Sequence, residues 1–208
     1  MHIQGQSALV TGGASGLGEA TARELARLGA KVAVLDRNQA LAEKVAAEIG
    51  GVACACDITD TDSVNAALDK AAAAHGPARI LMNVAGIGSA KRIVGKDGNP
   101  APLEDFVRVV QINLVGSYNV SRLFAARCAK LDATEGGDKG VMVFTASAAA
   151  FDGQVGQQAY SASKGGLVGM TLPMARDLAQ HGIRVCTLAP GLFATPLLLE
   201  LPEPVQQS

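Results

Sequence analysis

Short apolar runs recur along the chain, and most are followed by a stretch in which apolar positions repeat with helical spacing. Runs that are apolar at nearly every position predict strands buried on both faces of a sheet. The predicted strands are Ser7–Thr11, Lys31–Asp36, Val52–Cys56, Arg79–Asn83, Val141–Thr145 and Arg184–Ala189. The predicted helices are Leu17–Leu28, Leu41–Ile49, a helix capped at Asp60–Ser63 that runs to Ala74, Phe106–Lys130 entered through Leu103–Asp105, and Gln158–Gln180.

This alternation of strand and helix predicts the fold class. Strands buried on both faces belong in a parallel sheet with helices on each side. We therefore expect an α/β fold, a Rossmann-type doubly wound parallel sheet, with residues 1–208 forming one domain. The polar segments Gly88–Pro102 and Ala133–Gly140 are expected to be loops at the surface.

Composition excludes several classes of function. Apolar residues make up 49% of the chain, the formal net charge is -1, and there is no Trp, so nothing indicates a nucleic-acid partner. No apolar run approaches the roughly 18 residues of a membrane span. The first six residues lead directly into a predicted strand and leave no room for a targeting peptide, so we expect a cytoplasmic protein.

The four cysteines do not indicate a metal site. Cys54 and Cys56 alternate within a predicted strand and share one of its faces, but no further ligands lie near them in the sequence. We expect all four, with Cys128 and Cys186, to be small buried thiols and expect no bound metal.

A glycine-rich turn follows the first predicted strand. Glycines allow a tight turn that approaches a pyrophosphate closely, and the helix that follows offers free N–H groups and a partial positive charge. A plain structural turn is the alternative, but the position between strand and helix near the N-terminus favours a dinucleotide. The turn residues expected to contact the cofactor are Gly12, Ser15, Gly16, Leu17 and Gly18.

Asp36 ends the second predicted strand, 18 residues after Gly18. A carboxylate at this place can accept hydrogen bonds from the adenosine ribose, and it repels the 2′-phosphate of NADP. Arg37 is a mild signal in the opposite direction, but the turn itself carries no basic residue. We therefore expect NAD as cofactor.

Tyr160 and Lys164 lie four residues apart and so share one face of a predicted helix. A nearby ammonium favours the phenolate form, and lowering the pKa of tyrosine to about 7 requires roughly 4 kcal/mol. Lys164 and a positively charged nicotinamide together are expected to supply it. An ordinary helical Tyr–Lys pair is the alternative. Ser161–Lys164 also matches an S-x-x-K acyl-enzyme motif, but its companion motifs S-D-N and K-T-G are absent.

These residues, taken in order, resemble the short-chain dehydrogenase/reductase family from Ser7 to about Pro196. The resemblance implies catalytic roles for Asn113, Ser147, Tyr160 and Lys164. Tyr160 would exchange the hydroxyl proton, Ser147 would orient the substrate oxygen, and Asn113 would position a water that relays protons to Lys164. Further cofactor contacts are implied for Asp57, Ile58, Asn83, Val84, Ala85, Gly86, Tyr160, Lys164, Pro190, Gly191, Phe193 and Thr195. Val84 departs from the polar residue that the family has in this N-N-A-G segment.

A narrower resemblance is to the type II 3-hydroxyacyl-CoA dehydrogenases, some of which also accept hydroxysteroids. It rests on the segments Thr145–Gln157, Gly165–Pro173 and Pro190–Leu198, together with the long loop before Pro102. It implies NAD-linked oxidation of a 3-hydroxyacyl-CoA, with Ser147, Gln154 and Tyr160 at the substrate. The basic residues Lys91, Arg92 and Lys96 of the loop are candidates for holding coenzyme A; a solvated surface turn is the alternative.

Other functions remain open at this point. A 3-oxoacyl-carrier-protein reductase or a hydroxysteroid dehydrogenase would use the same four residues. The family resemblance also implies a homodimer or homotetramer paired through the two long helices. Members of the family continue past Val205 with a helix and a last strand, so we expect a sheet that lacks this strand and a pocket that lacks one wall. A nucleotide-binding scaffold with weak activity is therefore a third possibility.

Overall fold

The computed structural model describes residues 1–195 and contains one parallel sheet. Its strands are β1 (Ser7–Thr11), β2 (Lys31–Asp36), β3 (Val52–Ala55), β4 (Ala78–Asn83), β5 (Gly140–Thr145) and β6 (Ile183–Leu188). They lie in the order β3-β2-β1-β4-β5-β6, and every pair is parallel. The predicted doubly wound fold is confirmed.

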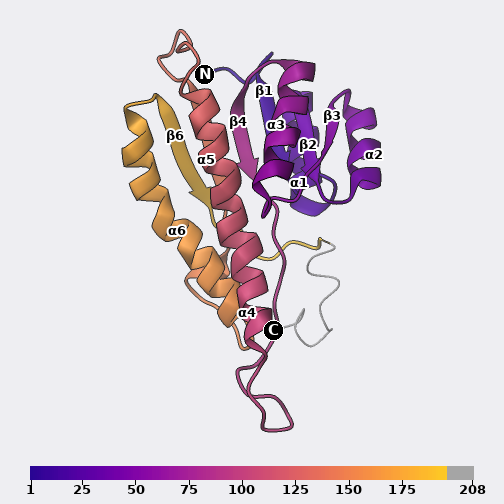
Figure 1. Cartoon of the computed structure of the whole chain (residues 1–208), viewed down its shortest axis with the longest axis vertical. Coiled ribbons are helices and arrows are strands. Elements are labelled where there is room, and N and C mark those ends of the chain that lie inside the picture. The colour runs from indigo at the N-terminus through magenta and orange to yellow at the C-terminus, as the bar shows by residue number, and fades with distance from the viewer. Residues whose placement is uncertain (196–208) are drawn as a thin grey trace.

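Helices connect the strands and cover the sheet (Figure 1). They are α1 (Gly16–Arg27), α2 (Gln39–Ile49), α3 (Thr61–His75), α4 (Leu103–Val110), α5 (Ser117–Cys128) and α6 (Gln158–Ala179). One core cluster packs α1 and α2 against one face of β1 and β2, and the other packs α3, α5 and α6 against the opposite face. Apolar side chains therefore meet on both faces of the central strands, as their continuous apolar runs require.

The sixth strand departs from this pattern. Ile183 and Val185 are buried beside α6, whereas Arg184 and Cys186, which alternate with them, are exposed. Within residues 1–195 helices cover only one face of β6. The expectation that all four cysteines are buried is therefore wrong for Cys186, because it lies on the uncovered face; Cys54, Cys56 and Cys128 are buried.

The long helix predicted at Phe106–Lys130 begins earlier, at Leu103, and ends at Cys128. Its middle, Gln111–Gly116, is a π-helical segment that joins α4 to α5, and Asn113 lies in it. Figure 1 shows α4 and α5 as one continuous helix that reaches beyond the sheet to the loop before α4. Such π segments are rare and occur frequently at functional sites. Apolar periodicity does not reveal them, because only one residue is gained in the turn.

Within the described residues, no helix is both long enough and apolar enough to cross a membrane. The prediction that the family's last helix and strand are missing concerns the C-terminal end of the chain, and residues 196–208 lie outside the described residues.

Candidate active site

A cavity of about 680 Å³ opens at the carboxyl ends of the strands. The chain leaves β1 for β2 on one side and later returns to β4 on the other, so β1 and β4 are neighbours at a topological switch point. Loops at such a point separate and leave a crevice between them. Residues that follow β1, β2, β4 and β5 line this cavity, together with residues of α6 and of the segment after β6.

The glycine-rich turn between β1 and α1 forms one wall. It packs on itself so closely that a Cβ atom on Gly18 would lie 1.9 Å from the carbonyl oxygen of Gly12. Gly12 has a φ of 65°, and a Cβ there would lie 2.7 Å from the Cα of Ala85. The Ser15 side chain does not cap α1, so no side chain occupies the first N–H groups of this helix. Glycines at these two positions thus bring the helix N-terminus to the cavity.

Thr11, which sequence reasoning did not single out, holds the turn after β4. Its hydroxyl accepts hydrogen bonds from the backbone N–H groups of Val84 and Ala85, at 3.1 and 3.2 Å. Both residues line the cavity, whereas Thr11 is 1% exposed and lies behind them. This hydroxyl therefore ties two neighbouring cavity walls together.

Two carboxylates lie at the end of the cavity beside β2 and β3. Asp36 accepts hydrogen bonds from the N–H groups of Ala14, at 3.2 Å, and Asn38, at 2.9 Å. Hydrogen bonds from the Thr59 side chain and backbone lower the pKa of Asp57. Arg37 is exposed and pairs with Asp57 across 3.5 Å. Arg37, the residue after Asp36, is thus already paired with another carboxylate.

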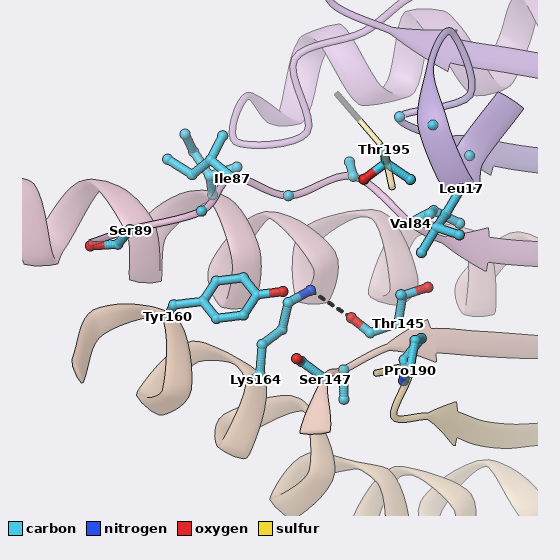
Figure 2. Close-up of a pocket in the computed structure, with 18 of the residues that line it drawn as sticks. Leu17, Val84, Ile87, Ser89, Thr145, Ser147, Tyr160, Lys164, Pro190 and Thr195 are labelled. Atoms are coloured by element: carbon cyan, nitrogen blue, oxygen red, sulfur yellow. Dashed lines mark hydrogen bonds between the residues drawn. The ribbon is translucent and has the colours of Figure 1, made fainter. Parts of the chain in front are cut away.

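Tyr160, Lys164 and Ser147 meet at the opposite end of the cavity. Figure 2 shows the Tyr160 hydroxyl, the Lys164 ammonium and the Ser147 hydroxyl pointing into one space, with Leu17, Val84 and Thr195 farther along the same pocket. The Lys164 Nζ donates to the carbonyl oxygen of Thr145 at 2.6 Å and lies 5.6 Å from the centre of the Tyr160 ring. Three residues from two strand–helix units therefore converge on one point.

Burial has the largest effect on the pKa values of Lys164 and Tyr160. It lowers the pKa of Lys164 to about 8. It also raises the pKa of Tyr160 above its ordinary value, while a hydrogen bond with Ser147 acts in the opposite direction. The expected lowering of the Tyr160 pKa by Lys164 together with a positively charged nicotinamide stays a prediction. The protein removes both groups from water, which disfavours the charged form of each.

Most of the residues expected at the site line the cavity, including Gly86, Ile58, Gln154, Pro190, Gly191 and Phe193. Two do not. Asn83 is 2% exposed and donates from Nδ2 to the Ser121 hydroxyl at 3.1 Å, and Asn113 is fully buried behind Ile87. Both side chains therefore lie behind the cavity, and the roles expected for Asn83 at the cofactor and for Asn113 in positioning a water stay predictions.

The cavity also has walls that the sequence patterns did not indicate. Ile87, Ser89, Arg108 and Gln111 come from the loop after β4 and from the long helix that follows it. Arg108 lies in α4 and Gln111 begins the π segment, and the sequence patterns assigned neither side chain a role. In the basic loop that contains Lys91, Arg92 and Lys96, the Lys91 ammonium already pairs with the Asp105 carboxylate at 2.9 Å.

Comparison with known proteins agrees with this geometry. A family model described as short chain dehydrogenase matches residues 6–206. The chain belongs to the short-chain dehydrogenase family. It is 50% identical over 208 residues to the 3-hydroxyacyl-CoA dehydrogenase type-2 of Bos taurus, an alignment that covers 98% of this chain and 79% of the relative.

Solved structures give the same assignment. A 3-hydroxyacyl-CoA dehydrogenase type-2 from Mycobacterium avium superposes with a TM-score of 0.88 at 40% identity, covering 97% of this chain and 83% of that one. A 3-ketoacyl-(acyl-carrier-protein) reductase from Brucella melitensis, complexed with NADH, superposes with a TM-score of 0.85 at 36% identity, covering 95% and 80%. The chain is therefore an oxidoreductase of a family that binds a nicotinamide cofactor.

Proposed function

We propose that this protein interconverts a 3-hydroxyacyl-CoA and a 3-oxoacyl-CoA with NAD. The observation that carries the proposal is the convergence of Tyr160, Lys164 and Ser147 at one end of a cavity whose other end has a glycine-rich turn and a carboxylate. The names of the relatives that are about half identical over nearly the whole chain support the substrate.

The cavity fits a nicotinamide dinucleotide. The N-terminus of α1, which has no side-chain cap, suits the pyrophosphate, and Asp36 suits the adenosine ribose. Asp57 and Ile58 line the end expected to hold the adenine, and Thr195 and Phe193 line the nicotinamide end. When bound, the cofactor supplies the hydride acceptor for alcohol oxidation.

Four side chains have separate roles in the proposed reaction. In the oxidation direction, Tyr160 accepts the proton of the substrate hydroxyl at its phenolate oxygen. Ser147 donates a hydrogen bond to the substrate oxygen and stabilises the charge that develops there. Lys164, held by the Thr145 carbonyl oxygen, binds the nicotinamide ribose and supplies positive charge beside the Tyr160 oxygen. Gln154, on the same side of the cavity, contacts the substrate.

The exposed apolar side chains on the long helices support a homodimer or homotetramer. Tyr118 on α5 is 48% exposed, and Leu172 on α6 is 55% exposed. A contact between copies of the chain through these helices would remove both side chains from water. Measuring the molar mass in solution tests this part of the proposal, and a monomer contradicts it.

A substrate panel tests the activity directly. We expect turnover of 3-hydroxyacyl-CoA esters of several chain lengths with NAD, measured by NADH absorbance. Activity confined to hydroxysteroids, or to 3-oxoacyl-carrier-protein with NADPH, would replace the proposed substrate by one of those classes. Binding of NADH without turnover of any of them would leave a nucleotide-binding scaffold.

The Tyr160→Phe variant is the control for chemistry at this site. It removes only the hydroxyl, so the fold and NAD binding should persist while turnover falls by about 10²- to 10⁴-fold, the usual contribution of a general acid–base group. Circular dichroism and NADH fluorescence check the first two. A variant within threefold of the parent in turnover would contradict the role of Tyr160.

A further inference from the structure

Ser163 lies on α6 between Tyr160 and Lys164, and its side chain faces away from the cavity. It is fully buried. Its hydroxyl accepts a hydrogen bond from the Asn113 Nδ2 at 3.1 Å and donates one to the carbonyl oxygen of Tyr160 at 2.7 Å. This hydroxyl therefore connects the π-helical segment to the backbone of the residue proposed to carry the reaction.

Asn113 continues this connection to the cavity wall. Its Oδ1 accepts from the Ile87 N–H at 2.8 Å, and its Nδ2 also donates to the Ile87 carbonyl oxygen at 3.0 Å. Ile87 lines the cavity, whereas Asn113 does not. The amide is thus held by three hydrogen bonds, and Ser163 is the partner that joins it to α6.

No water reaches these atoms from the surface, since Ser163 and Asn113 are both fully buried. Removing the Ser163 hydroxyl would leave one Asn113 N–H without an acceptor, and a buried donor without a partner costs about 1–3 kcal/mol. The amide could recover part of this only by turning, which would break its paired bonds with Ile87. The π-helical segment, α6 and the segment that carries Ile87 would then lose the hydrogen bonds that join them through Asn113.

We propose that Ser163 is a positioning residue that holds the Tyr160 turn of α6 in register with the Ile87 wall of the cavity. The proposal rests on the proposed function, in which Tyr160 exchanges the substrate proton. A rigid contact here matters because displacements of about 1 Å at a reacting group can lower a rate by as much as 100-fold.

The first test compares three variants in steady-state turnover with whichever substrate the parent protein accepts. Ser163→Ala should lower kcat by about 10-fold, which corresponds to about 1.4 kcal/mol, with the KM for NAD within about twofold. Ser163→Thr keeps the hydroxyl and should restore most of kcat. Thr171→Val is the matched control, because the Thr171 hydroxyl donates to the Leu167 carbonyl oxygen on the same helix and also pairs with the Thr187 hydroxyl on β6, and neither partner lines the cavity. An equal loss of kcat in Thr171→Val would overturn the proposal.

The second test observes Tyr160 without turnover. The chain has two tyrosines and no Trp, so a Tyr118→Phe background leaves Tyr160 as the only source of tyrosinate absorbance near 295 nm. Burial raises the pKa of Tyr160, so loosening its helix turn should move this pKa downward, toward about 10. Ser163→Ala should show the downward shift, and Ser163→Thr and Thr171→Val should not.

The two tests separate failure of this inference from failure of the proposed function. An unchanged kcat or an unchanged Tyr160 titration in Ser163→Ala would overturn the positioning role. A parent protein that binds NADH but turns over neither 3-hydroxyacyl-CoA nor hydroxysteroid would contradict the proposed function, while the titration would still decide whether Ser163 holds Tyr160.

Discussion

At the residue scale, the two charged side chains Lys164 and Asp36 are held at the site in different surroundings. Lys164 is buried, its Nζ donates to the Thr145 carbonyl oxygen, and its pKa falls to about 8. Asp36 stays oriented by two backbone N–H groups at the edge of the cavity. The first arrangement provides a cation that is easily deprotonated, and the second provides a fixed negative charge.

The lowered pKa of Lys164 predicts a pH dependence of stability. Between about 8 and the ordinary value of 10.5, the unfolded chain binds a proton that the folded protein does not. The free energy of unfolding should therefore gain a contribution as pH rises through this window and lose it as pH falls toward 8. The full difference is on the order of 3 kcal/mol. Urea unfolding of the parent and of Lys164→Met at several pH values measures it; parallel curves would contradict the shift.

Asp36 predicts the choice of cofactor. Its carboxylate should repel the 2′-phosphate of NADP, so the parent should prefer NAD, and Asp36→Ala should narrow the ratio of kcat/KM between the two cofactors. Arg37→Ala is a useful comparison, because Arg37 is turned toward Asp57 and its removal should leave the preference for NAD intact. Equal turnover of NAD and NADP by the parent would show that Asp36 does not select the cofactor.

At the scale of the element, glycines decide where α1 and the turn before it can pack. Gly18 is in an ordinary helical conformation, so its importance comes from the space around it rather than from its backbone angles. The Gly12 carbonyl oxygen occupies the position that a side chain would need. The approach of α1 to the cavity therefore depends on the absence of a single carbon atom.

Gly18→Ala should lower thermal stability and weaken NADH binding together, because the helix N-terminus must move away from the turn. Gly169→Ala is the control, since Gly169 lies inside α6 with no atom within 4 Å of the added carbon. That substitution should stabilise the protein by up to about 0.5–1 kcal/mol. Melting temperature and NADH fluorescence titration check both variants. A stable Gly18→Ala that binds NADH normally would show that the turn can relax.

At the scale of the whole molecule, charge is spread thinly, with a formal net charge of -1. The basic side chains Lys91, Arg92 and Lys96 are exposed in the loop that leads from β4 to α4, and this loop begins at the cavity with Ile87, Gly88 and Ser89. The Lys91 N–H donates to the Gly156 carbonyl oxygen, which joins this loop to the segment before α6. The loop is thus anchored beside the cavity.

Replacing Lys91, Arg92 and Lys96 together with Gln should raise the KM for acyl-CoA substrates and leave the KM for an uncharged hydroxysteroid unchanged. The phosphates of coenzyme A would lose their positive partners, whereas the steroid has no charge to bind. The difference should shrink at high salt, because exposed charges are screened beyond about 8–10 Å at physiological ionic strength. Because Lys91 also pairs with Asp105, Asp105→Asn controls for the loss of that ion pair. Equal changes in KM for both substrates would show that these basic side chains do not bind coenzyme A.

The sequence alone was sufficient for the fold class, the order of elements and most of the cavity lining. Apolar runs report burial on both faces of a strand, and glycine, Asp36 and the Tyr160–Lys164 spacing are local features that do not depend on distant parts of the chain. Only the tertiary structure decided that Asn113 and Asn83 lie behind the cavity, that Cys186 is exposed, and that Thr11 and Ser163 join separate walls. It also shows that burial raises the pKa of Tyr160. Each of these depends on which distant atoms pack against a side chain and exclude water from it, and residue spacing along one segment carries no information about that.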